Sequence, residues 1–147
     1  MLSKKTQYAF KALIFLAEQT EKGPVLISEI SKRKNIPLKF LENILLELRK
    51  AGVLESKKGK GGGYYFSVDP KQVSLAKVMR LLDGPIALLP CVSLNFYEKC
   101  KDCDEKICGL NRMMIQVRDS MLKVLETKTV ADLAHCTLET LQTRNMM

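Results

Sequence analysis

Four of the five cysteines gather in one short segment of the second half of the chain. They are spaced C-x8-C-x2-C-x4-C over eighteen residues, at Cys91, Cys100, Cys103 and Cys108. The residues between them are mostly polar or charged, which predicts a loop rather than a core element. Thiolates are soft ligands, so a loop with four of them can hold zinc in a tetrahedral site or an iron–sulfur cluster of the 2Fe–2S or 4Fe–4S type.

The spacing alone leaves other uses of these cysteines open. Disulfide staples suit a secreted protein, but Met1-Leu2-Ser3-Lys4-Lys5 leads straight into an amphipathic pattern and not into a signal peptide. Zinc without a cluster fits the spacing as well. A thiolate oxidised reversibly without any metal is a further possibility, since it would be flanked by Lys99, Lys101 or Lys106.

The net charge of +8 is concentrated in the first part of the 147-residue chain. Residues 1–80 contain 16 Lys and Arg against 7 Asp and Glu, whereas residues 81–147 contain 8 against 9. Such a segregated basic excess is typical of a nucleic-acid-binding module. No apolar run approaches the roughly 20 residues of a membrane span, so we expect a cytoplasmic protein without a membrane partner.

Three helices are predicted in the basic half. Ser3 caps the first, which ends at Gly23-Pro24; Ser28 caps a short second helix that runs to Lys34. Pro37 opens a third helix that ends near Lys50, before Gly52. Its inner face consists of Leu41, Ile44, Leu45 and Leu48. Two short helices joined by a tight turn are the helix-turn-helix arrangement.

A β-hairpin is predicted next, with strands at 53–56 and 64–68. Its tip combines three lysines with four glycines, which supply positive charge and allow close approach to a surface. These residues are Lys57, Lys58, Gly59, Lys60, Gly61, Gly62 and Gly63. A nucleotide-binding loop is disfavoured because the G-x-x-x-x-G-K-[ST] pattern is absent and no helix follows. We therefore predict that the hairpin is a wing that contacts DNA phosphates.

The remaining elements surround the cysteine loop. Ser74 caps a helix that ends at Asp83-Gly84-Pro85, and an apolar linker follows. After Cys108 a long helix has an apolar stripe with little left to pack on in its own chain, which favours a partner helix from a second subunit. The stripe is Leu110, Met114, Val117, Met121 and Val124. Thr129-x-x-Asp132 is a capping box for a short last helix over 130–134.

The predicted fold is mostly α with a small β-wing. Residues 1–84 form a winged helix-turn-helix domain, residues 85–108 the linker and cysteine loop, residues 109–136 the dimerisation helix and a short helix, and residues 137–147 a polar, frayed tail.

The chain resembles a known family, the Rrf regulators. These are winged-helix repressors of the IscR and NsrR type. The resemblance covers nearly the whole chain. It is carried by Gln7-Tyr8-Ala9, Phe40-Leu41-Glu42, Leu48-Arg49-Lys50-Ala51-Gly52, Gly61-Gly62-Gly63-Tyr64 and Thr129-Val130-Ala131-Asp132-Leu133. It implies a homodimer on a palindromic operator in double-stranded DNA, with affinity set by an iron–sulfur cluster in the cysteine loop.

The chain departs from the family pattern in three places. Cluster-binding relatives commonly supply three cysteines, whereas this loop has four. Cys91 and Cys108 match the outer two, and either Cys100 or Cys103 could be the middle ligand. Asn111 stands where some relatives have a ligating histidine, which excludes a histidine ligand there. Phe40 replaces a frequent tyrosine. The single histidine, His135, and the neighbouring Cys136 are interpreted as structural.

Side chains at the start of the third helix are expected to enter the major groove. They are Lys39, Phe40, Glu42 and Asn43. An enzyme is disfavoured because one distant histidine does not make a catalytic constellation with the cysteines. An iron–sulfur or metal carrier would have no need of the wing. A thiol-based or zinc-containing redox repressor without a cluster stays open.

Overall fold

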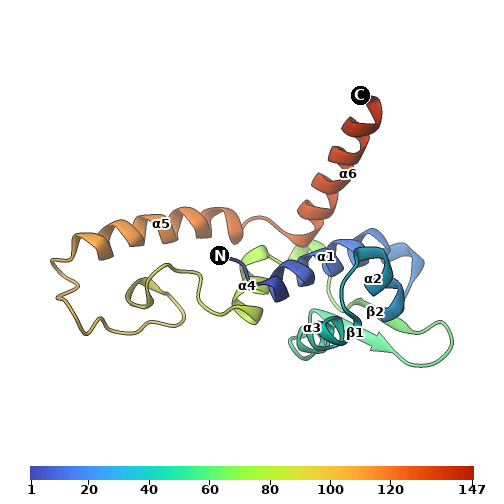
Figure 1. The fold of residues 1–147 in the computed structure, drawn as a ribbon, viewed down its shortest axis with the longest axis horizontal. Coiled ribbons are helices and arrows are strands. Elements are labelled where there is room, and N and C mark those ends of the chain that lie inside the picture. Colours follow the sequence, from blue (N-terminus) through green and yellow to red (C-terminus); the bar gives the residue numbers. More distant parts are fainter.

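The computed structural model describes residues 1–147 as a packed body from which two helices extend (Figure 1). The body contains α1 (Lys4–Glu18), α2 (Ile27–Lys34), α3 (Leu38–Lys50), β1 (Leu54–Lys57), β2 (Gly63–Phe66) and α4 (Leu75–Leu82). Helices α5 (Gly109–Leu125) and α6 (Val130–Met146) follow the cysteine loop. Single turns of 3-10 helix lie at Thr20–Lys22, Pro70–Gln72 and Pro90–Val92. The predicted winged-helix class is confirmed.

One apolar core holds the body together. The predicted inner face of α3 is fully buried, together with side chains of α1, α2 and β1. Val130, at the start of α6, joins the same core and anchors that helix to α1. The second apolar cluster is much smaller. It joins α4, the linker and α5, and its buried members are Ala76, Ile86 and Leu122.

The wing is an antiparallel hairpin in which Leu54 pairs with Phe66 and Lys57 with Gly63. A third extended residue, Val25, exchanges two backbone hydrogen bonds with Tyr64, of 2.9 and 2.8 Å. This pairing ends the extended piece at Val25, so α2 begins at Ile27. The prediction that Ser28 caps α2 was wrong: the N-cap is Leu26, without a side-chain bond.

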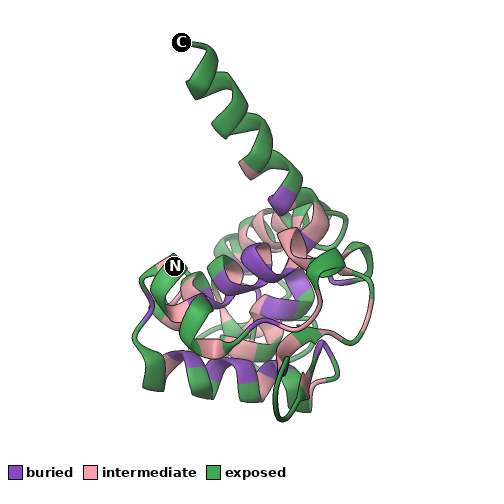
Figure 2. Ribbon diagram, turned by 90° about the vertical axis from the view of Figure 1, so that its right-hand side faces the viewer, coloured by how far each residue is buried: buried purple, intermediate pink, exposed green.

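Helix α6 is much longer than predicted. The Thr129 and Asp132 capping box is confirmed, but the helix continues to Met146 and does not end near Ala134. The polar tail consists of residues that tolerate a helix. The hydroxyls of three threonines, Thr137, Thr140 and Thr143, donate to backbone carbonyls one turn earlier. Figure 2 shows α6 leaving the body as an exposed helix beyond its buried first turns. No helix of the chain is long and apolar enough to span a bilayer.

Candidate DNA-binding surface and cysteine site

The start of α3 presents three of its four predicted reading residues to solvent. Lys39, Glu42 and Asn43 are exposed. Phe40 is half-buried and packs edge-on against Tyr8 of α1, with ring centroids 5.6 Å apart. The aromatic ring therefore helps to seat α3 on α1. Contacts of these four residues with DNA stay a prediction.

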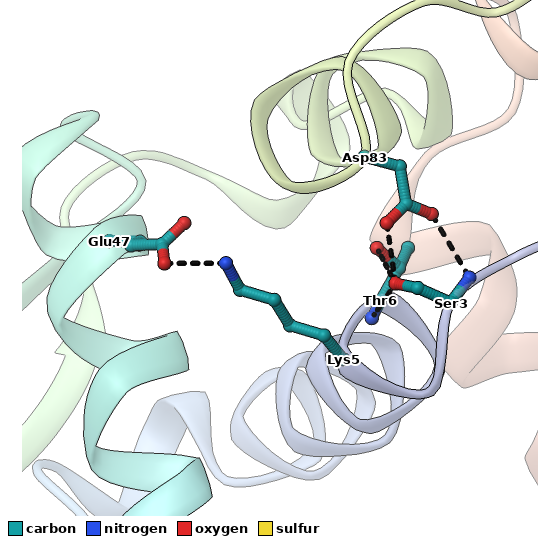
Figure 3. A network of polar contacts seen from close by, with 5 residues as sticks. All are labelled: Ser3, Lys5, Thr6, Glu47 and Asp83. Carbon is teal, nitrogen blue, oxygen red and sulfur yellow. Dashed lines mark hydrogen bonds and ion pairs between the residues drawn. The ribbon is translucent and has the colours of Figure 1, made fainter.

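Polar contacts from α1 tie α3 to the end of α4 (Figure 3). Lys5 Nζ lies 2.6 Å from Glu47 Oε1 on α3. Ser3, the N-cap of α1, donates its hydroxyl and its backbone N–H to Asp83, which follows α4. Partial burial raises the pKa of Asp83, but the bonds from Ser3 and Thr6 outweigh it and leave that pKa below its ordinary value. Helix α1 thus connects α3 to the linker that leads into the cysteine loop.

The wing tip exposes Lys57, Lys58 and Lys60, as predicted. Gly59 and Gly61 are also exposed and have φ of +89° and +74°, which glycine adopts without strain.

Gly62 differs from its neighbours because it is buried inside the turn. Its N–H donates to Gly59 O at 3.0 Å, and a Cβ there would overlap the carbonyl oxygen of Lys57. The tip therefore requires Gly62 for its shape, and its predicted contact with DNA stays untested.

Two basic side chains of α2 were missed by the sequence reasoning. A shallow open hollow of about 560 Å³ lies between α2 and the start of α3. Its lining is Ser28, Glu29, Ser31, Lys32, Arg33 and Leu38. The first helix of a helix-turn-helix crosses the DNA backbone, which makes Lys32 and Arg33 candidates for phosphate contacts. The run Lys32-Arg33-Lys34 was the available signal.

All four clustered cysteines line one cavity of about 380 Å³. Cys91 lies in the 3-10 turn after the linker, and Cys108 is the N-cap residue of α5. The remaining lining is Leu89, Pro90, Glu98, Lys99, Lys101, Asp102, Leu110 and Asn111. The four cysteines that the sequence grouped together thus line one cavity, and their role as metal ligands stays a prediction.

Asn111 contacts the two outer cysteines. Its side-chain Nδ2 donates to Cys91 Sγ at 3.3 Å, and its backbone N–H donates to Cys108 Sγ at 3.4 Å. The backbone bond is the main reason why the pKa of Cys108 lies below its ordinary value. Sequence reasoning had used Asn111 only to exclude a histidine ligand.

The middle cysteines form a separate pair. Cys103 Sγ lies 3.3 Å from Cys100 Sγ, and hydrogen bonds with Cys100 and then Cys108 raise the pKa of Cys103 to about 12. Glu105 organises this part of the loop by accepting from Cys100 N at 2.7 Å and from the Tyr97 hydroxyl at 2.9 Å. No three His, Cys, Asp or Glu side chains of the chain already lie at the spacing of a metal site.

His135 and Cys136 take no part in this cavity. Both are exposed on α6, and His135 Nδ1 lies 3.4 Å from Glu139 Oε1. Neither side chain belongs to the core, so their interpretation as structural residues finds no support in packing.

Comparison with known proteins identifies the family. A family model described as an iron-dependent transcriptional regulator, Rrf2, matches residues 2–136. The chain belongs to the Rrf2 family. An rrf2-like helix-turn-helix regulator of Rhodobacter capsulatus is 41% identical over 137 residues, which cover 90% of this chain and 91% of that protein. CymR of Bacillus subtilis is 30% identical over 136 residues, or 92% of this chain and 91% of CymR.

Solved structures agree with the sequence relatives. The structure of CymR, the global cysteine regulator of B. subtilis, matches with a TM-score of 0.77 at 28% identity, covering 92% of this chain and 96% of CymR. IscR of T. potens matches with a TM-score of 0.76 at 26% identity, covering 95% of this chain and 90% of the IscR chain. These relatives are transcriptional regulators. This Rrf2 family member is accordingly a DNA-binding transcriptional regulator with a winged-helix fold.

Proposed function

We propose that the protein is a homodimeric regulator that binds a palindromic operator and adjusts its affinity through the cysteine loop, which holds an iron–sulfur cluster. The observation that carries the sensing role is the convergence of Cys91, Cys100, Cys103 and Cys108 on one cavity. The half-exposed stripe of α5 supports the dimer: Leu110 and Val124 are 58% and 54% exposed in the single chain.

Operator reading is assigned to the exposed start of α3. Glu42 can accept a hydrogen bond from a cytosine amino group, and such a contact contributes about 1 to 3 kcal/mol of discrimination. Glu42→Ala should therefore reduce the preference for the matched operator over one with that base pair changed. Glu139→Ala removes a distant exposed carboxylate from α6 and serves as the matched control. An unchanged preference in Glu42→Ala would remove this residue from the reading surface.

The wing lysines are assigned to phosphate contacts that do not depend on sequence. Lys58→Ala should lower the slope of log affinity against log salt by about one unit. Lys123→Ala, an exposed lysine on α5, should leave the slope unchanged. Weaker binding of Lys58→Ala with an unaltered salt slope would contradict this assignment.

The donors around the cavity fit an iron–sulfur cluster in kind, and the loop would have to draw the thiols closer together to bind it. Four thiols surround it, and Asn111 already orients two of them by hydrogen bonds. A bound cluster would supply a redox- and iron-sensitive group whose loss changes the bonds to the thiols. Anaerobic purification with visible absorption and iron and sulfide analysis tests the assignment. Colourless, iron-free protein with stoichiometric zinc would contradict it.

Contacts of the chain suggest how a change in the loop reaches the DNA-binding body. Arg118 of α5 donates to Val92 O at 2.7 Å, beside Cys91. At the other end of α5, Leu75 N donates to Lys128 O at 3.0 Å, which attaches the start of α4 to the junction with α6. We propose that a change around Cys91 alters the tilt of α5, and with it the spacing of two reading helices that must fit half-sites about 34 Å apart.

A second candidate function is thiol-based sensing without a cluster, favoured by the 3.3 Å between Cys100 Sγ and Cys103 Sγ. A peroxide would accept two electrons and two thiol protons from this pair and leave as two molecules of water, while an S–S bond forms. Peptide mapping of peroxide-treated, metal-free protein tests this candidate. A Cys100–Cys103 disulfide that changes operator affinity would support it, and the absence of that disulfide would exclude it.

A further inference from the structure

We infer that Asn111 is a positioning residue that selects Cys91 and Cys108 as the anchored pair of the cysteine loop. This inference rests on the proposed function, because it gives Asn111 a role in the same site. Through the side chain and the backbone of one residue, the two thiols that lie farthest apart in the loop sequence are attached to the first turn of α5.

Burial explains why an asparagine is suited to this position. Asn111 is only 7% exposed, although its neighbours Leu110 and Arg112 are exposed. A buried amide that lacks a partner is destabilising, and Cys91 Sγ accepts from its Nδ2. An amide N–H that faces a sulfur ligand stabilises the thiolate form without competing for the metal. A histidine or carboxylate there could itself become a ligand.

The same side of α5 makes a second contact with the Cys91 segment. Arg118 lies seven residues after Asn111, two turns along the helix, and donates to Val92 O. Its side chain is 14% exposed, so this bond is shielded from water. Cys91 and the residue after it are therefore both held by donors from α5.

Cys100 and Cys103 have no such attachment to α5. Their contacts are with each other, with Glu105 of the loop and, for Cys103, with the Cys108 thiol that precedes α5. Metal binding would thus begin from a pre-positioned outer pair and recruit the middle pair by movement of the loop alone. Outer-shell hydrogen bonds of this kind typically change metal affinity by about 10- to 100-fold.

Cobalt binding to the metal-free, full-length protein tests the inference. Asn111→Leu keeps a branched side chain but removes its N–H donor to Cys91, while the backbone bond to Cys108 is retained. Thiolate-to-cobalt absorption should show about 10- to 100-fold weaker binding in Asn111→Leu. Asn95→Leu, in an exposed part of the same loop, should bind like the unmodified protein. Equal affinity in Asn111→Leu would overturn the inference.

A second measurement needs no metal. The side-chain amide of Asn111, assigned by its loss in Asn111→Asp, should exchange slowly with solvent in NMR spectra of the reduced protein. Cys91→Ala should shift its resonances and speed its exchange, whereas Cys100→Ala should not. An Asn111 amide that is unaffected by Cys91→Ala would contradict the contact itself.

The two measurements separate the inference from the proposed function. Unmodified protein that binds no cobalt through thiolates would count against the metal site, while the NMR contact would still be decided. Tight cobalt binding that is insensitive to Asn111→Leu would leave the metal site in place and exclude the positioning role.

Discussion

The winged-helix body and the cysteine arm, residues 90–125, are built on opposite principles. In the body, α1, α2, α3 and β1 share one continuous buried core. In the arm, the buried residues are Val92, Ser93, Asn111 and Leu122. Hydrogen bonds from α5 hold Cys91, Val92 and Cys108, but not Cys100 or Cys103. Packing fixes the shape of the winged-helix body, whereas the arm has little core of its own. This division suits the proposed sensing role, because a segment with little core can rearrange without unfolding the DNA-binding body.

The largest expected effect is that of truncating the core of the winged-helix body. Leu45→Ala should lower the free energy of unfolding by about 2 to 5 kcal/mol, because Leu45 is fully buried on the inner face of α3. Leu138→Ala, on the exposed part of α6, should change it by less than about 0.5 kcal/mol. Urea unfolding followed by circular dichroism measures both. Similar losses of unfolding free energy in the two variants would contradict the contrast between the packed body and the exposed part of α6.

Glycines sharpen the same contrast. Gly63 has φ of +139°, and a Cβ there would overlap Val25 O. Gly63→Ala should therefore lower the free energy of unfolding by about 2 kcal/mol or more and disrupt the wing. Gly109 begins α5 in open space, and Gly109→Ala should stabilise that helix by about 0.5 kcal/mol. Thermal unfolding of the two variants should give shifts of opposite sign. A destabilised Gly109→Ala protein would mean that the start of α5 is more constrained than its surroundings indicate.

A smaller effect is expected where the arm rejoins the body. The Thr129 hydroxyl caps α6 by accepting from Asp132 N. Thr129→Ala should therefore lower the free energy of unfolding by about 1 kcal/mol. Thr140→Ala, in the exposed middle of α6, is the control and should cost much less. Equal effects from both would show that the cap is not the main support of this junction.

The smallest effect is on acid stability. Bonds from Ser3 and Thr6 outweigh desolvation and depress the pKa of Asp83, so the folded chain holds its carboxylate at a pH where the unfolded chain binds a proton. Its contribution is therefore present above the ordinary pKa of 3.8 and is lost as the pH falls through the lower folded value. Asp83 is exposed, which limits the contribution to under about 1 kcal/mol. Asp83→Asn should flatten the acid side of the stability profile below about pH 4; an unchanged profile would contradict the role of this contact.

Elements with strong local patterns were predictable from the sequence. The spacing of Leu41, Ile44, Leu45 and Leu48 gave the buried face of α3, and the capping residues Ser3, Ser74 and Thr129 were found in their predicted places. The clustering of four cysteines predicted one loop that presents them together, and in the structure all four line one cavity.

Features that depend on contacts distant in sequence were not predictable. Pairing of Val25 with Tyr64 moved the start of α2, and burial of Gly62 inside the turn depends on the fold of the wing tip. Asn111 had no pattern that linked it to Cys91, twenty residues earlier. The length of α6 was missed because its polar residues gave no apolar stripe, although threonines and leucines can continue a helix.

The most direct test of the proposed sensing role is operator affinity measured by fluorescence anisotropy in two states of one protein. Anaerobically purified protein and the same protein after chemical removal of its cluster should differ by about 5- to 150-fold, the usual range of coupling between two sites. Cys136→Ala should keep this difference, whereas Cys91→Ala and Cys108→Ala should abolish it and bind with the affinity of the cluster-free protein. Equal affinity in both states of the unmodified protein, or full responsiveness of Cys91→Ala and Cys108→Ala, would contradict control of DNA binding through the cysteine loop.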